Sequence, residues 1–268
     1  MKNNIINTYF GFMHNPFSKN VKSEDLFKWK DFQNLASRFN FFLSEGGVFL
    51  LTGVIGSGKT TSLRDLMLSL NPNQYYIIYI HNSLDSKKDF YSSILDSCGV
   101  SDSHFACNSR RILRKHLKEL SMVKKQTPLI VLDEAQNLPA FILEEVRLLL
   151  NSDFDSFPLA SFILSGHKLL QQRISLHENE ALRQRITMKF HLHGYSLEET
   201  CAYISHRLEK AGSSAQIFSD SILARIHEES GGIPRVINNI CRSLLHAAYI
   251  SEKKYVDDII FNSARNEW

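Results

Sequence analysis

Short apolar runs alternate along most of the chain with longer segments in which apolar residues recur every three or four positions. The runs are rich in β-branched and aromatic residues, as strands are, and the longer segments have the period of amphipathic helices. The predicted strands are Gly47–Thr52, Tyr75–Ile80, Leu129–Asp133, Leu159–Ser165 and Ile186–Leu192. The predicted helices are Asp31–Leu43, Lys59–Leu70, Lys88–Cys98, Arg110–Val123, Ala140–Leu150 and Lys168–His177. This alternation predicts an α/β fold with a parallel sheet covered by helices on both faces.

The strand pattern stops near residue 195, and only helical patterns follow. Ser196-Leu-Glu-Glu199 has the sequence of a capping box, which opens a helix that we expect to reach about Ala211. Further amphipathic segments lie at about 220–230, 234–249 and 255–266. We therefore predict an α/β core over residues 1–195, with a distinct N-terminal segment over 1–30, and a helical lid over 196–268.

The composition changes this picture little. A hydrophobic fraction of 43% supplies a core, and a charged fraction of 22% is ordinary for a folded protein. No run of about 18 uncharged apolar residues occurs, and the first residues lack the apolar stretch of a signal peptide. We expect a cytoplasmic protein with no membrane partner. The net charge of +3 is the sum of +5 over residues 1–195 and −2 over the rest, a mild basic bias that permits an anionic partner without requiring one.

The first chemical signal is a glycine-rich loop between a predicted strand and a predicted helix. Gly53-Val-Ile-Gly-Ser-Gly-Lys-Thr60 fits the pattern G-x-x-x-x-G-K-[ST] at every fixed position. Its glycines let backbone N–H groups surround phosphate oxygens, and the helix N-terminus adds partial positive charge. Lys59 would reach the β- and γ-phosphates of ATP, and the Thr60 hydroxyl would bind Mg²⁺. The predicted nucleotide-binding residues of this loop are Gly53, Gly56, Ser57, Gly58, Lys59, Thr60 and Thr61.

A second signal follows the apolar strand Leu129-Ile-Val-Leu132. Two acids, Asp133 and Glu134, come directly after it, and adjacent acids at such a position are costly unless a cation and a reaction use them. Asp133 would bind Mg²⁺ together with Thr60, and Glu134 would polarise the attacking water. A solvated acid pair is the alternative. With the phosphate loop, the pair predicts a nucleoside triphosphatase.

Four further polar residues are candidates for the same site. Ser165 is the last residue of a predicted strand. It is either a sensor of the γ-phosphate or a residue that only ends the strand. Arg183 and Arg185 precede the last strand, either as an arginine finger for a neighbouring subunit or as surface residues. Arg235 falls in the first turn of a lid helix. A cation is unfavourable there without an anion nearby, which favours a phosphate sensor.

These segments, in this order, resemble AAA+ ATPases and, more narrowly, the ExeA-like family. The resemblance is carried by Tyr9-Phe-Gly-Phe12, Asn15-Pro-Phe17, the phosphate loop, Leu132-Asp-Glu-Ala-Gln-Asn137, Leu182-Arg-Gln-Arg-Ile186 and Ser230-Gly-Gly-Ile-Pro-Arg-Val-Ile-Asn238. It implies an AAA+ fold with strand order 5-1-4-3-2, Mg²⁺-dependent ATP hydrolysis, and a homo-oligomer that is a hexameric ring or a helical filament. It also implies that Asn15, Pro16 and Phe17 lie by the adenine, whereas composition alone makes Phe17 an ordinary core aromatic.

The family resemblance leaves the biological role open between two uses. Asp89-Phe-Tyr91, Asp153-Phe-Asp-Ser-Phe-Pro158 and Phe162-Ile-Leu-Ser-Gly166 resemble stand-alone transposition regulators of the TniB and TnsC kind, which act with a transposase and target-selector proteins. The other use is secretion or pilus assembly, in members that often carry a membrane helix and a wall-binding domain. Family members often have Gln where this chain has His167, so either Ser165 or His167 is the sensor. A nucleotide-switched scaffold with negligible turnover is a third possibility.

One predicted helix is strongly basic. Residues 109–126 hold seven Lys and Arg side chains against the single acid Glu119, around an apolar stripe. We expect five of them to contact the backbone of double-stranded DNA, without sequence preference: Arg110, Arg111, Arg114, Lys115 and Lys118. An ordinary solvated helix face is the alternative.

Overall fold

A computed structural model describes residues 5–19, 21–80, 84–102, 105–150 and 159–268. The stretch Asp153–Pro158, used above for the resemblance to transposition regulators, lies outside the described residues. The chain forms two compact units. The α/β unit comprises Asp31–Ile55 and Lys59–Leu192. The helical unit comprises Met1–Lys30, Gly56–Gly58 and His193–Trp268.

The α/β unit is built on a parallel sheet of five strands. The strands are β1 (Val48–Gly53), β2 (Tyr75–Ile80), β3 (Thr127–Leu132), β4 (Ser161–Gly166) and β5 (Ile186–Leu192). Their order is β2-β3-β4-β1-β5, and all the paired neighbours are parallel. The order expected from the resemblance is confirmed. The strands β1, β3 and β4 read as nearly continuous apolar runs because both of their faces are covered.

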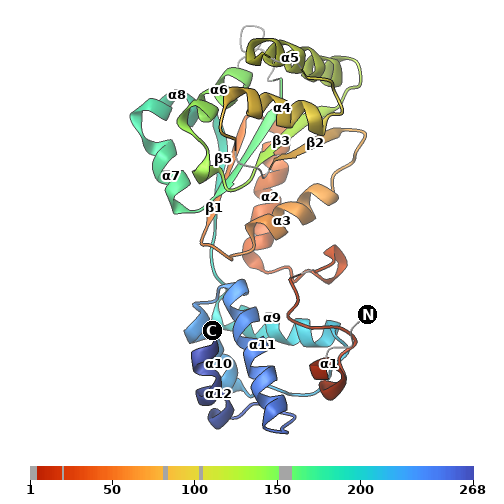
Figure 1. The fold of residues 1–268 in the computed structure, drawn as a ribbon, viewed down its shortest axis with the longest axis vertical. Helices are drawn as coiled ribbons and strands as arrows, with labels where there is room; N and C mark the ends of the chain where they lie inside the picture. The colour runs from red at the N-terminus through yellow and green to blue at the C-terminus, as the bar shows by residue number, and fades with distance from the viewer. Residues whose placement is uncertain (1–4, 20, 81–83, 103–104, 151–158) are drawn as a thin grey trace. The chain divides into compact units, whose positions relative to one another are not determined.

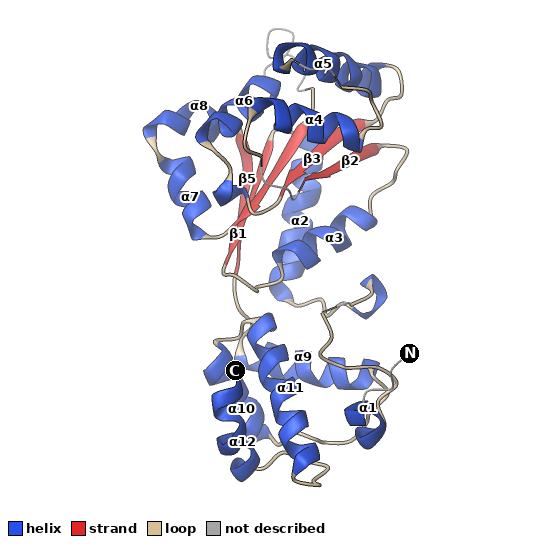
Figure 2. Ribbon diagram, in the orientation of Figure 1, coloured by secondary structure: helices blue, strands red, loops and turns tan. Residues whose placement is uncertain are grey.

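Helices cover both faces of the sheet (Figures 1 and 2). On one face, Phe39 and Phe42 of a helix that precedes β1 contact Phe49 of β1, with ring centroids 6.0 and 5.4 Å apart. On the other face, five helices share one hydrophobic cluster with alternate residues of the strands. The helices of this unit are α2 (Lys30–Glu45), α3 (Lys59–Leu68), α4 (Lys87–Ser97), α5 (Ala106–Met122), α6 (Ala140–Leu150), α7 (Lys168–Ser175) and α8 (Glu180–Arg183), with the 3-10 turns η2 (Ala135–Asn137) and η4 (His177–Asn179).

The strand register brings the polar strand ends together. Thr52 of β1 pairs with Gly166 of β4, and Leu132 of β3 pairs with Leu164 of β4. Because parallel strands end at the same edge of a sheet, Asp133 and Ser165 follow adjacent positions at the edge where β1 ends. This edge is where the loops of an open α/β sheet bind ligands.

The helical unit contains α1 (Ile5–Phe10), the 3-10 turns η1 (Ser23–Asp25) and η5 (Arg265–Glu267), and four longer helices. These are α9 (Leu197–Lys210), α10 (Asp220–Ser230), α11 (Pro234–Ile250) and α12 (Asp258–Ala264). The predicted capping box is present: the Ser196 side chain accepts from the Glu199 N–H, and the Glu199 side chain accepts from the Ser196 N–H. The N-terminal segment packs on these helices through Tyr9, whose ring lies 5.2 Å from that of Tyr249.

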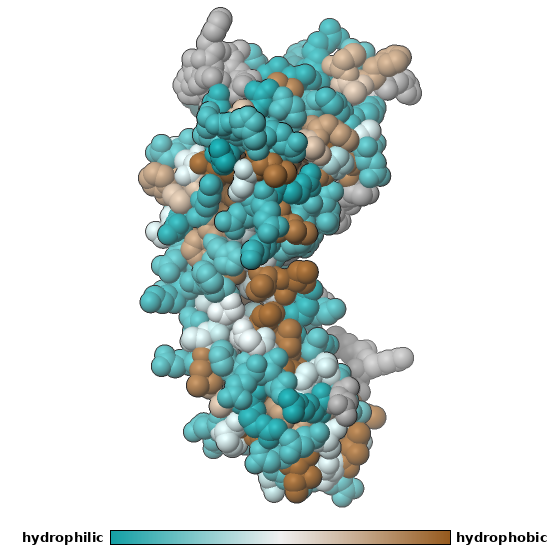
Figure 3. Space-filling model, turned by 90° about the vertical axis from the view of Figure 1, so that its left-hand side faces the viewer, coloured by the Kyte–Doolittle hydropathy of each residue, from teal (hydrophilic) through white to brown (hydrophobic). Residues whose placement is uncertain are grey.

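The structure differs from the sequence prediction in two respects. Residues 1–30 cluster with the C-terminal helices instead of with the α/β core, because aromatic side chains of this segment pack on α9 and α11. The basic helix α5 begins at Ala106, four residues before its predicted start, since its first turn lacks the apolar repeat. No helix among the described residues is long and apolar enough to cross a membrane. Hydrophilic residues cover most of the face drawn in Figure 3.

Candidate functional site

The phosphate loop leaves the sheet at the end of β1 and enters α3. Lys59, the first residue of α3, is buried, and its Nζ donates to the carbonyl oxygens of Gly53 and Val54, each at 3.0 Å. These contacts direct the ammonium group back over its own loop. A phosphate oxygen could replace the carbonyls as its partner, and such charge-assisted bonds are strong. Thr61, the third residue of α3, is half-buried.

Three elements meet at one carboxylate oxygen. Oδ2 of Asp133, just after β3, accepts from the Thr60 hydroxyl of α3 at 2.7 Å and from the Tyr79 hydroxyl of β2 at 2.7 Å. The predicted pairing of Thr60 with Asp133 is therefore present across 73 residues of sequence. Tyr79 was not predicted, because it lies within an apolar strand and its hydroxyl gives no signal in the sequence.

Asp133 is held as a carboxylate. Burial opposes its ionisation, but hydrogen bonds from the Tyr79 and Thr60 hydroxyls and from the Glu134 N–H lower the pKa of Asp133 below its usual value. Burial, followed by the hydrogen bond to Asp133, raises the pKa of Tyr79 well above 10. Ser165 Oγ is fully buried and makes no hydrogen bond within the described residues. It is a polar group at this site still able to take a partner.

Glu134 follows Asp133 in a different environment. Its backbone is left-handed, with φ of 51°, which is uncommon for a residue with a side chain, and its side chain is exposed. Oε2 of Glu134 accepts a hydrogen bond of 2.6 Å from the amide of Gln136. The two adjacent acids thus lie in different environments: Asp133 is buried among hydroxyl donors, and Glu134 is accessible to water.

These groups fit a magnesium ion and a phosphate. A hydroxyl and a carboxylate oxygen, from Thr60 and Asp133, are the hard ligands that Mg²⁺ binds in phosphoryl-transfer sites. The ammonium of Lys59 and the unpaired Ser165 hydroxyl suit phosphate oxygens. When bound, the metal would supply positive charge that offsets the charge on the phosphates.

In the helical unit, the tip of the phosphate loop lies against the start of α11. The Arg235 N–H donates to the Gly56 carbonyl at 3.3 Å. Gly56 has φ of +86°, and a Cβ on it would lie 2.7 Å from Cβ of Arg235, so only glycine fits. Pro234 occupies the first turn of α11, as the sequence suggested, and the Arg235 side chain is exposed. The backbone of the predicted phosphate sensor is thus fixed to the loop.

An aromatic side chain lies beside the same loop. Trp29 is buried, and a Cβ on Gly58 would lie 3.8 Å from its Cη2 atom. The Trp29 ring also contacts the ring of Tyr195, 5.0 Å away. Between the two glycines, Ser57 Oγ is fully buried without a hydrogen-bond partner within the described residues.

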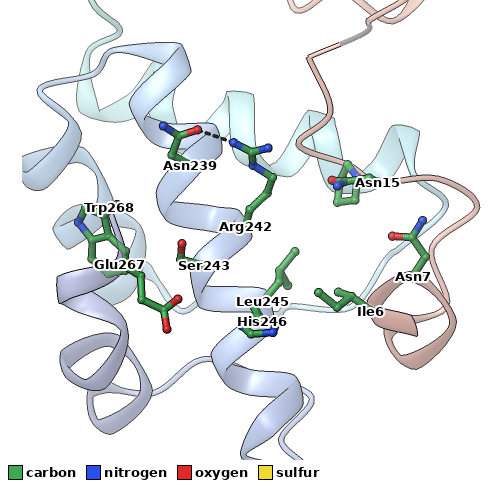
Figure 4. Close-up of a pocket in the computed structure, with 11 residues that line it drawn as sticks. Ile6, Asn7, Asn15, Asn239, Arg242, Ser243, Leu245, His246, Glu267 and Trp268 are labelled. Atoms are coloured by element: carbon green, nitrogen blue, oxygen red, sulfur yellow. Dashed lines mark hydrogen bonds between the residues drawn. The ribbon is translucent and has the colours of Figure 1, made fainter. Parts of the chain in front are cut away.

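A polar cavity of about 490 Å³ lies in the helical unit along one side of α11 (Figure 4). Asn15 and Pro16 line it from the N-terminal segment, facing Asn239 and Arg242 of α11. A cavity of this size suits a nucleobase with its sugar. Phe17 does not line it: the side chain is fully buried, and its N–H donates to Oδ1 of Asn15.

One buried arginine fixes the N-terminal segment to α9. Arg207 donates from Nε to the Pro16 carbonyl at 2.6 Å and from Nη2 to the Ser18 carbonyl at 2.8 Å. Its guanidinium also lies 5.7 Å from the ring centre of Tyr203. A buried guanidinium with oxygen partners on both sides holds the backbone on either side of Phe17 in one position.

The two candidate arginine fingers differ in exposure. Arg183, at the end of α8, is exposed, with Nη1 bonded to the Ser175 carbonyl at 3.3 Å and Nη2 at 4.0 Å from Glu180. Arg185 is half-buried, and its carbonyl accepts from the Val48 N–H at 3.1 Å. Arg183 therefore has the more accessible guanidinium.

The basic helix α5 divides its cations between two faces. Arg114 donates to the Leu148 carbonyl of α6 at 3.3 Å. Burial opposes the ionisation of Glu145 on α6, but hydrogen bonds from Lys87 and Tyr91 lower its pKa, and the charge of Arg110 adds to this effect. Arg111 and Lys115 are exposed and have no acidic partner among the described residues, and Lys118 is half-buried. Of the five predicted DNA contacts, Arg111 and Lys115 are thus the most accessible.

Comparison with known proteins agrees with this architecture. A model of the AAA domain family matches residues 43–174. Together with the sheet order and the phosphate loop, this match shows an AAA+ P-loop fold. The chain is also 35% identical over 244 residues to general secretion pathway protein A of Aeromonas hydrophila, which supports the ExeA-like assignment. That alignment covers 90% of this chain and 44% of the relative, so the chain spans less than half of the relative's length.

Solved structures share the fold at low sequence identity. Cdc6p from Pyrobaculum aerophilum superposes with a TM-score of 0.73 at 16% identity, covering 94% of this chain and 70% of that one. The ORC1 protein of Aeropyrum pernix, solved in complex with DNA, gives 0.68 at 17% identity over 96% and 69%. The Thermotoga maritima RuvB branch migration motor gives 0.58 at 14% identity over 94% and 73%.

Proposed function

We propose that the protein hydrolyses Mg²⁺-ATP at the edge of the sheet. Lys59 binds the β- and γ-phosphates, Thr60 and Asp133 hold the metal, and Glu134 accepts a proton from the attacking water. The observation that carries this proposal is the hydrogen bond from the Thr60 hydroxyl to Oδ2 of Asp133. This bond and the others to Asp133 favour its ionised form. The exposed Glu134, adjacent to Asp133, is then the proposed base.

Further residues complete the proposed ATP site. The buried, unpartnered Ser165 hydroxyl supports its role as a γ-phosphate sensor, with His167 as the alternative. Arg235 begins at the tip of the phosphate loop and is proposed as a second sensor. Asn15 and Pro16 are proposed to contact adenine through the polar cavity, whereas Phe17 supports them from the core.

We propose that ATP assembles copies of the chain into a ring or filament in which an arginine reaches the neighbour's γ-phosphate. The exposed end of α8 favours Arg183 over Arg185 as that finger. The Glu134→Gln variant with Mg²⁺-ATP should sediment as an oligomer, and adding Arg183→Ala should shift it towards monomer; Arg225→Ala on α10 is the matched control. A monomer with ATP, both with and without DNA, would contradict the proposal.

We further propose that the ATP-loaded oligomer binds duplex DNA without sequence preference and recruits a transposase, as a cytoplasmic transposition regulator working with target-selector proteins. The supporting observation is the exposed pair Arg111 and Lys115, four residues apart on one side of α5. Phosphate contacts of this kind release counterions, so affinity depends steeply on salt. The resemblance to TniB and TnsC supplies the transposase as partner.

The test is duplex binding with ATP, with ADP and without nucleotide. Binding should be strongest with ATP, and the double substitution Arg111→Glu and Lys115→Glu should weaken it for all sequences by roughly tenfold or more. Arg110 and Arg114 are left intact because Arg114 bonds to α6 and the charge of Arg110 acts on Glu145. The control is Lys22→Glu with Lys189→Glu, the same charge change elsewhere. Equal, weak binding in all three nucleotide states would remove the DNA proposal.

The second candidate is an ATPase of secretion or pilus assembly. The observation that favours it is the 35% identity to general secretion pathway protein A, which extends over 90% of this chain. ATP-dependent assembly without DNA binding would support this use over transposition. A protein that binds ATP and assembles with no measurable turnover would instead be a nucleotide-switched scaffold.

A further inference from the structure

A glutamine side chain connects the proposed base to the end of the neighbouring strand. Gln136 lies in η2, just after β3, and is 8% exposed. Its Nε2 donates to Oε2 of Glu134 at 2.6 Å, and its Oε1 accepts from the His167 N–H at 3.2 Å. One buried amide therefore donates a hydrogen bond to Glu134 and accepts one from the backbone that follows β4.

The surroundings of Gln136 leave its amide little freedom. Arg173 of α7 donates from Nη1 to the Gln136 carbonyl at 2.6 Å, which fixes the backbone. A Cβ on Gly166 would lie 2.4 Å from Oε1 of Gln136, so the glycine at the end of β4 makes room for this amide. With both its backbone and its side chain held, Gln136 can orient the group to which it donates.

Glu134 needs such an anchor. Its side chain is exposed, and it extends from a backbone in the left-handed region. The amide of Gln136 binds only one of its two carboxylate oxygens. A carboxylate held by one oxygen keeps a defined direction and retains the other oxygen for a water molecule.

We propose that Gln136 is a positioning residue that holds the Glu134 carboxylate in its working orientation and makes that orientation depend on the end of β4. The dependence arises because the same amide binds the N–H of His167, two residues after the buried Ser165. This inference rests on the proposed role of Glu134 as the base. A movement of the β4 end on contact with phosphate would then reach Glu134 through one side chain.

The experiment measures steady-state ATP hydrolysis and ATP binding for two variants of nearly unchanged size. Gln136→Met removes both bonds of the amide. Gln136→Glu keeps an acceptor for His167 but places a carboxylate where the donor was. Both should lower kcat by about 10- to 100-fold, the effect of a misplaced catalytic group, and leave ATP affinity unchanged. Gln172→Glu, the same chemical change at an exposed position of α7, is the control and should match the parent.

A double-mutant cycle separates positioning from a general structural role. If Gln136 acts through Glu134, then Gln136→Met should not slow the residual turnover of Glu134→Gln any further. A full additional loss in that background, or an unchanged or raised kcat in the single variants, would overturn the proposal. A parental rate for Glu134→Gln alone would overturn the base and the positioning role together. A slow Glu134→Gln with normal Gln136 variants would overturn only the positioning role.

Discussion

Replacing Glu134 by glutamine is expected to leave ATP binding intact and to slow hydrolysis by a factor of about a hundred to ten thousand. The substitution keeps the size of the side chain and its contact with Gln136, but an amide cannot accept the proton of the attacking water. Asp133, Thr60 and Tyr79 do not bond to the side chain that is changed, so the metal site should remain. Phosphate release and equilibrium ATP binding, measured on the same preparation, check both parts.

The matched control for this variant is Glu144→Gln. Glu144 lies on α6 and pairs with Arg147 on the surface, away from the strand ends, so its loss should leave turnover at the parental rate. Hydrolysis by Glu134→Gln as fast as by the parent would show that another group activates the water. Negligible turnover in the parent itself would favour the scaffold.

Replacing Lys59 by alanine is expected to weaken ATP binding by roughly a hundredfold, the loss of one or two hydrogen bonds from a charged donor. The ammonium group lies over its own loop, bonded to the carbonyls of Gly53 and Val54, where a phosphate would meet it. Lys59→Arg should not restore ATP binding, because the planar guanidinium group is larger than the compact ammonium group that it replaces.

Binding of Mg²⁺-ATP by calorimetry tests this expectation, with thermal unfolding of the same samples as a check on the fold. Lys168→Ala, at an exposed position of α7, is the control and should bind like the parent. Parental affinity in Lys59→Ala, in a protein that unfolds at the parental temperature, would rule out the proposed role of the loop lysine.

Local patterns were sufficient to predict the strands and the pairing of Thr60 with Asp133. β2 and β5 begin and end at the predicted residues, since apolar or alternating residues between polar boundaries mark strands. Thr60 and Asp133 could be paired because each follows from a short motif next to a strand. The strand order came only from the family resemblance, because spacing says which segments are strands but not which are neighbours.

The unpredicted residues depend on contacts between distant segments. Tyr79 reaches Asp133 only because β2 lies beside β3 in the sheet, and nothing in an apolar strand marks one tyrosine as a donor. Arg207 appears in the sequence as one more cation of an amphipathic helix, yet it is buried against the carbonyls of Pro16 and Ser18. Composition likewise could not show that Arg114 of the basic helix donates a hydrogen bond to the Leu148 carbonyl of α6.

The contact between Trp29 and Gly58 has a practical consequence for studying this protein. The sequence contains two tryptophans, and only Trp29 lies against the phosphate loop, buried in an aromatic cluster with Tyr195. Indole emission depends on the polarity and mobility of its surroundings. With Trp268 replaced by phenylalanine, the protein would carry a single built-in optical probe beside the loop, and ligand binding could be followed in real time on an unlabelled chain.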